Sequence, residues 1–283
     1  MDHSARQRLM AGPAPRPGPG APGLSLILAL VVALVLVRVP ARAAEDQPPS
    51  VDDLVQYFDT IVFKSEFKGV AASKVVKKWT QPLRVAIRAF EEETTVRKGG
   101  REVVTLQQVK VKKPHLRFIK KHLTTLVRAT GLKTEDAKKI GEAPNFLINF
   151  VPRRQMGNPN LADAEPKLLA RLAAEGGCYF LIWSDGTSGE ISQAVVVVNA
   201  ERLLIRINHC LLEEMTQSLG LPNDTNIIAS SIFSDQSRRT DLTATDIIVL
   251  KTLYDPRMKV GLPRAEALPV ASEIIAGMVE ARR

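Results

Sequence analysis

An apolar segment near the N-terminus of this chain of 283 residues separates a short leader from the rest of the sequence. Residues 24–37 are apolar apart from Ser25, and three arginines precede them. Fourteen residues are too few to cross about 30 Å of hydrocarbon comfortably, but they suit the hydrophobic region of a secretory signal peptide. Pro40 then breaks the run, and the small residues that end at Ala43 favour cleavage there.

We therefore expect a signal peptide over residues 1–43, a linker over 44–50 and a mature chain in the periplasm. An uncleaved leader that tethers the protein to the membrane is the alternative. No stretch after the leader approaches 18 apolar residues, so the sequence predicts no second membrane span. The net charge is +9, and residues 1–43 contribute +4 of it. The mature part is thus only modestly basic, which argues against nucleic acid as a partner.

The two cysteines of the chain, Cys178 and Cys210, both lie in the part that we expect to be exported. In an oxidising compartment an even pair favours a disulfide over two free thiols. Two small, buried apolar side chains are the alternative. We expect the bridge.

Helical and strand patterns alternate along the mature chain, which predicts an α+β domain over residues 51–262, with a mixed sheet flanked by helices. A separate C-terminal helix is expected within residues 263–283. The charged stretch after residue 88 is poorly patterned, and Gly99-Gly100 suggests a turn in it. Apolar spacing predicts helices over 51–63, 115–130, 165–174, 200–219, 243–254 and 264–279, and strands over 82–88, 145–151, 178–183 and 191–198.

The helix expected over residues 200–219 carries an unusual set of polar side chains. Helical spacing places on one face Cys210, Glu213, Glu214 and Gln217. The opposite face, which should pack against the sheet, holds Leu204, Leu211, Met215 and Leu219. A solvated polar face is the simplest interpretation of such a pattern. His209 lies one turn earlier, and we assign it to packing or to the surface.

Residues 213–224 read EEMTQSLGLPND. This block resembles an uncharacterised family of exported proteobacterial proteins with the pattern E-E-x-T-Q-x-L-G-L-x-N-D. It is also distantly similar to the metzincin zinc-peptidase motif H-E-x-x-H-x-x-G-x-x-H. Glu213, Gln217 and Asn223 stand where that motif has its three zinc-binding histidines, and Glu214 matches the general base. The resemblance implies a metzincin-peptidase-like fold with a degenerate active-site helix.

The departures from the metzincin motif decide the chemistry that we expect. Zinc needs imidazole or thiolate ligands, and one carboxylate with two amides makes a much poorer site. We therefore expect no cofactor and the loss of the catalytic zinc site. Calcium is an alternative, because Glu213, Glu214, Asn223 and Asp224 are all oxygen donors. Structural pairing of these side chains within the domain is the role that we rank first, ahead of a binding cleft for a peptide or glycan and of calcium.

The sequence thus predicts a pseudoenzyme, a non-catalytic binding or scaffolding module. Its binding residues would be Glu213, Gln217, Asn223 and Asp224, and its partner a protein, peptide or glycan of the cell envelope. A divergent hydrolase with Glu214 as general base is one alternative. A membrane-anchored structural protein of the envelope is the other.

A basic stretch over residues 110–122 is the remaining signal, with five lysines and an arginine among its thirteen residues. Contact with anionic lipid or lipopolysaccharide is one interpretation. We prefer a solvated helix face, which is the commoner role of such a run.

Overall fold

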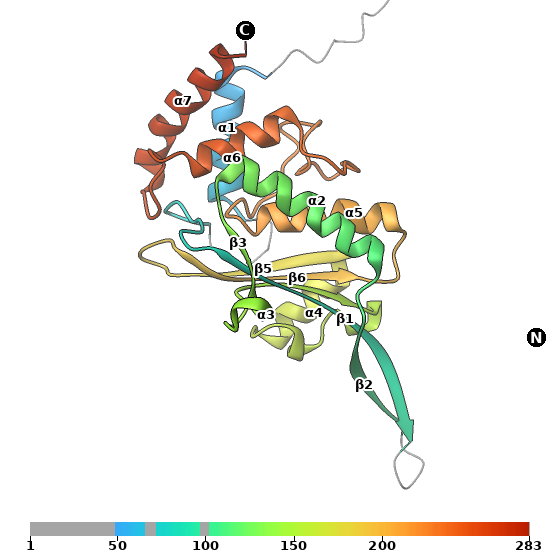
Figure 1. Cartoon of the computed structure of the whole chain (residues 1–283). Helices are drawn as coiled ribbons and strands as arrows, with labels where there is room; N and C mark the ends of the chain where they lie inside the picture. The colour runs from blue at the N-terminus through green and yellow to red at the C-terminus, as the bar shows by residue number, and fades with distance from the viewer. Residues whose placement is uncertain (1–48, 66–71, 97–101, 283) are drawn as a thin grey trace, which may run out of the picture. The chain divides into compact units, whose positions relative to one another are not determined.

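The computed structural model describes residues 49–65, 72–96 and 102–282 (Figure 1). The predicted signal peptide and the Gly99-Gly100 turn therefore lie outside the described residues. Residues 48–283 form one compact unit. No helix in the described part of the chain has both the length and the apolar character needed to cross a bilayer.

A mixed sheet of six strands runs through this unit, and it confirms the predicted α+β class. Its order is β2-β1-β4-β6-β5, with the short β3 pairing parallel to the start of β1. Strands β1, β4 and β6 are mutually parallel, whereas β2 and β5 run antiparallel to their neighbours. The strands are β1 (Leu83–Val96), β2 (Glu102–Val109), β3 (Thr134–Asp136), β4 (Phe146–Val151), β5 (Cys178–Ser184) and β6 (Ile191–Asn199).

Helices cover both faces of the sheet (Figure 1). On one face lie α1 (Val51–Phe63), α2 (Lys113–Thr130), α5 (Leu204–Gln217), α6 (Ala244–Tyr254) and α7 (Arg264–Glu280). On the other lie α3 (Ala137–Ile140), α4 (Pro166–Glu175) and two short 3-10 turns, Arg153–Gln155 and Pro159–Leu161. A larger apolar core fills the first layer and a smaller one lies beneath α4. The helix predicted near the C-terminus is α7, and its Ala267 and Ile275 belong to the larger core.

Local sequence explains where these helices begin and end. Ser50 and Asp53 form a capping box that starts α1, and Gly131, in the left-handed conformation with φ 74°, ends α2. Thr243 and Asp246 form the same box at the start of α6. Asp246 is fully buried and also accepts a hydrogen bond of 2.6 Å from the Ser231 hydroxyl, so it ties the loop before α6 to the helix.

The strand predicted over residues 82–88 continues to residue 96 and forms a hairpin with β2, so the poorly patterned stretch is a strand pair. Sequence periodicity did not reveal it because most of the outer hairpin is exposed and no residue of β2 is fully buried. Two further expectations were wrong. Helix α5 begins at Leu204 rather than at residue 200, and Leu204 is 48% exposed instead of facing the sheet.

Candidate functional site

Helix α5 is enclosed on two sides, which places its polar face inside the protein. Leu211 and Met215 pack into the larger core, while the chain after the helix folds back over its other side. Glu214 and Gln217 keep only 7% and 2% of their surface exposed. The interpretation as a solvated polar face is therefore wrong, because the loop over residues 223–239 covers it.

A disulfide joins Cys178, at the start of β5, to Cys210 in the middle of α5, with the two Cα atoms 6.0 Å apart. This confirms the predicted bridge. The Arg202 guanidinium lies against the bridge, with Nη1 3.0 Å from the Cys210 sulfur. It occupies the space above Gly177, where a Cβ would come within 1.9 Å of Nη1, so a larger residue there would displace the guanidinium.

His209 is buried, as its assignment to packing allows, and it also belongs to the polar cluster. Its Nε2 lies 3.3 Å from Oε2 of Glu213, and its Nδ1 lies 2.7 Å from the Arg239 carbonyl oxygen. A carbonyl oxygen only accepts, so Nδ1 carries the proton of the ring. Burial lowers the pKa of His209, which favours the neutral ring with Nε2 as an acceptor. A protonated Glu213 carboxyl group, 3.3 Å away, would complement this acceptor.

The surroundings of Glu213 favour the same protonated state. Burial raises the pKa of Glu213 well above its ordinary value, and the carboxylates of Asp224 and Asp235 raise it further. The positive charge of Arg202 acts in the opposite direction but does not reverse the shift. A raised pKa favours the protonated carboxyl group, which is a poorer metal ligand than a carboxylate.

The other predicted binding residues are held by partners within the chain. The Gln217 amide nitrogen donates to a carboxylate oxygen of Asp224 over 2.7 Å, and that of Asn223 donates to the Asp224 carbonyl oxygen over 2.7 Å. Glu214 and Asp224 have further interactions with their surroundings. The structure thus brings Glu213, Gln217 and Asp224 together with His209 and Asp235, two residues that spacing did not select.

This cluster does not fit a zinc ion. The residues in place of the three histidines are a carboxyl group close to His209 and two amides whose nitrogens already donate hydrogen bonds to Asp224. Within the described ranges, no group of three His, Cys, Asp or Glu side chains is arranged to hold a metal ion. The predictions about zinc and calcium remain for a metal assay to decide.

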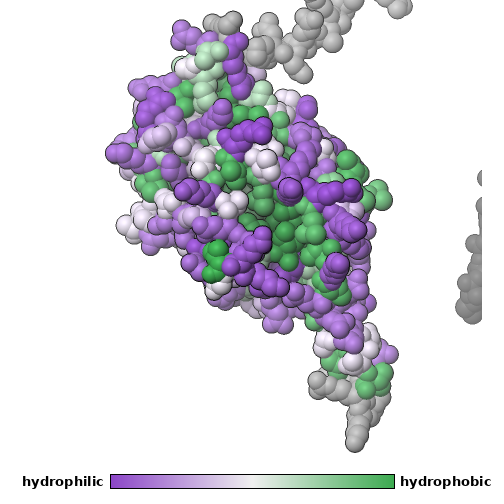
Figure 2. Space-filling view, in the orientation of Figure 1, coloured by the Kyte–Doolittle hydropathy of each residue, from purple (hydrophilic) through white to green (hydrophobic). Residues whose placement is uncertain are grey.

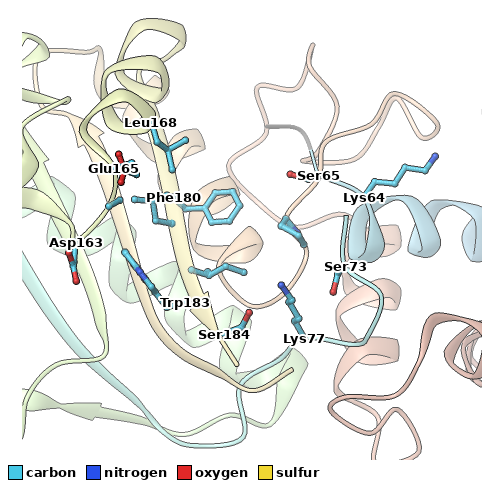
Figure 3. Close-up of a pocket in the computed structure, with 14 residues that line it drawn as sticks. Lys64, Ser65, Ser73, Lys77, Asp163, Glu165, Leu168, Phe180, Trp183 and Ser184 are labelled. Atoms are coloured by element: carbon cyan, nitrogen blue, oxygen red, sulfur yellow. The ribbon is translucent and has the colours of Figure 1, made fainter. Parts of the chain in front are cut away.

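A pocket of about 350 Å³ lies at β5, and the sequence did not predict it (Figure 3). Successive side chains of a strand point to opposite faces, so Phe180 and Ile182 join the larger core while Leu181 and Trp183 join the smaller one. All four line the pocket. The pocket therefore follows the edge of β5 and reaches both faces of the sheet.

The rims of the pocket carry opposite charges. Lys77 lies on one side of β5, and Asp163 and Glu165 lie on the other, beside Leu168 (Figure 3). The one signal in the sequence was the run FLIW at residues 180–183, four large apolar side chains in succession. A strand at the edge of a sheet has no need of such a run unless something covers it.

Residues 51–273 match the family described as a protein of unknown function, DUF2927. The match covers more than half of the chain, so the chain belongs to this family, and the expectation of an uncharacterised domain family is confirmed at that level. Comparison with curated proteins and with solved structures gives no match. The diagnostic block at residues 213–224 and the similarity to metzincins both stay predictions.

Proposed function

We propose that this domain is a non-catalytic binding module that holds an extended peptide along β5. One observation carries the proposal: the pocket spans both faces of β5 and is lined there by four successive side chains of that strand. A strand in this position offers main-chain groups to an incoming strand, a mode of peptide recognition known as β-augmentation.

The register of β5 identifies the main-chain groups that an added strand would meet. The Gly177 carbonyl accepts a hydrogen bond of 2.8 Å from the Asn199 amide of β6. Hydrogen-bonded pairs alternate along an antiparallel ladder, so Tyr179 and Leu181 also direct their main-chain groups toward β6. The N–H and C=O groups of Ile182 therefore point away from the sheet and into the pocket region.

Side chains of the pocket then set the kind of peptide. The apolar surfaces of Leu168 and Trp183 suit alternate apolar side chains of an extended segment. Lys77 on one rim and Glu165 on the other suit a peptide with acidic and basic residues on opposite sides of its apolar positions.

The alternative of a divergent hydrolase has less support. Glu214, the candidate general base, keeps only 7% of its surface exposed and does not line this pocket. Its neighbour Glu213 lies 3.3 Å from Nε2 of His209 and does not line this pocket either. A peptidase activity that disappears in a Glu214→Gln variant would overturn the non-catalytic proposal.

We also propose that the module acts in the periplasm. The leader supports this location, and so does the disulfide, since such bridges persist in oxidising compartments. Mass spectrometry of the protein from cell envelopes should find a new N-terminus at Ala44. An intact leader would instead favour the membrane-anchored alternative.

A peptide selection tests the binding proposal. A random peptide library is selected on residues 48–283, and the recovered peptides are titrated while tryptophan emission is followed. Trp183 lines the pocket and should respond, whereas Trp79 is 2% exposed and should not. A Trp183→Phe variant should lose the signal, and Ile182→Pro should lose binding because it removes an outward N–H. An emission change that persists in Trp183→Phe, or peptides that bind Ile182→Pro as tightly as the wild type, would place the site elsewhere.

A further inference from the structure

Three consecutive large aliphatic side chains stand exposed where α5 begins. Leu203, Leu204 and Ile205 keep 73%, 48% and 57% of their surface accessible. Single exposed apolar residues are ordinary on a protein surface, but three in succession at the start of one helix are not. Such clusters mark contact with a partner or with a membrane.

The start of α5 lies at the same end of the domain as the start of α2. Lys112 and His115 share a small pocket with Glu201, just before α5. Further along both helices, Nε2 of His122 lies 2.8 Å from the Asn208 side-chain oxygen. These two points of contact follow the same order in each helix, so α2 and α5 run parallel and their first turns lie together (Figure 1).

The first turns of α2 surround this end with positive charge. Lys112, Lys113 and Arg117 are exposed, and α2 contains no acidic residue. Leu116, between them, is 41% exposed and opens onto a shallow apolar groove along the helix. Figure 2 shows both features, a green band along α2 and green side chains at the right edge where α5 begins, each bordered by purple.

We propose that this end of the domain binds the surface of a bilayer that contains anionic phospholipid. We call it the α2–α5 tip, and it consists of Lys112, Lys113, Leu116, Arg117, Leu203, Leu204 and Ile205. The aliphatic side chains insert among the headgroups, while the cations lie against lipid phosphates. Membrane-surface segments combine these same two features.

The composition of the tip favours a membrane over a protein partner. Protein interfaces are enriched in aromatic side chains and depleted of lysine at their centres. The tip has no aromatic residue and carries Lys112 and Lys113 beside its aliphatic side chains. The tip also shares no residue with the pocket at β5, so the membrane proposal and the peptide-binding proposal can fail independently of each other.

Vesicle co-sedimentation of residues 48–283 tests the proposal. This fragment forms one compact unit that contains both cores, and it lacks the leader, which would bind lipid by itself. We expect binding to vesicles of phosphatidylcholine with phosphatidylglycerol, little binding to phosphatidylcholine alone, and weaker binding at high salt because ions screen the attraction.

Paired variants locate the binding surface. Leu204→Ser with Ile205→Ser, and separately Lys112→Glu with Lys113→Glu, should each lower the partition coefficient by about tenfold or more. The matched controls lie on α3, across the sheet. Ile140, 44% exposed, is changed to Ser, and its two neighbouring lysines, 138 and 139, are changed to Glu. These controls should bind as the wild type does.

A local probe reports insertion directly. Both native cysteines are bridged, so Leu204→Cys provides a single thiol for an environment-sensitive fluorophore, and Ile140→Cys provides the control. The emission should shift to the blue with anionic vesicles for the first variant only. Wild-type protein that stays in solution with anionic vesicles at low salt would overturn the proposal and leave a protein partner as the candidate. Equal losses in tip and control variants would overturn it too.

Discussion

The disulfide between β5 and α5 allows a stability prediction with a worked magnitude. Its cysteines are 32 residues apart in sequence. A cross-link that closes a loop of this length lowers the entropy of the unfolded chain by about 12 cal/mol/K, which corresponds to about 3.7 kcal/mol at 25 °C. Reduction should therefore lower the free energy of unfolding by about that amount. In a domain of this size, Tm should fall by roughly 7–15 °C.

Urea unfolding of residues 48–283 measures the effect in three samples. They are the oxidised protein, the same protein with reductant, and a Cys178→Ala/Cys210→Ala variant that should not respond to reductant. Reduction should also raise the m-value, because the unfolded chain exposes more surface once the cross-link is gone. If oxidised and reduced proteins unfolded within about 1 kcal/mol of each other, the entropic argument would be refuted for this bridge.

Three further predictions concern substitutions at single residues. Burial raises the pKa of Glu213 above its ordinary 4.5, so the folded state keeps a proton that the unfolded state releases. Stability should fall as pH rises from about 4.5 toward the folded-state pKa, and Glu213→Gln, compared by urea unfolding at pH 5 and pH 8, should remove that fall. Gly220→Ala should lower the free energy of unfolding by about 2 kcal/mol or more in thermal unfolding, because φ is 108° and a Cβ would lie 2.1 Å from the Lys77 carbonyl oxygen. The control Gly186→Ala should change stability little, because no atom lies within 4 Å of its added Cβ. Asp246→Ala should cost about 3 kcal/mol or more in chemical denaturation, since it leaves buried donors unpaired, and an equal cost for the exposed Asp241→Ala would contradict this reasoning.

The sequence predicted the elements whose apolar residues follow the spacing of their buried positions. The helix over residues 51–63 matches α1 because one face is apolar, and the run over residues 145–151 matches β4 because both faces of that strand are covered. Strand β2 carries no such pattern, because it lies in a hairpin with little buried surface. The periodicity of apolar residues indicates which positions are buried. It predicts a helix or a strand only where that element has a buried face.

The candidate site was predictable in part for a related reason. Helical spacing correctly placed Glu213 and Gln217 on one face of α5, and the four-residue step from His209 to Glu213 was available in the sequence as well. Spacing could not show that the loop with Asp224 returns over that face. The sequence could not predict the pocket at β5, because its walls come from segments that are distant from β5 in sequence, such as the one that contains Lys77.

Strand β1 has a mechanical consequence for the hairpin. Its first half pairs with β4 inside the sheet as far as Ala89, and from that same residue it pairs with β2 out to Val96. No loop or bend interrupts the strand at the change of partner. The hairpin therefore has no hinge at its base, and its direction is fixed by the twist of the central sheet. Any force applied to the hairpin is transmitted along one continuous backbone to the centre of the domain.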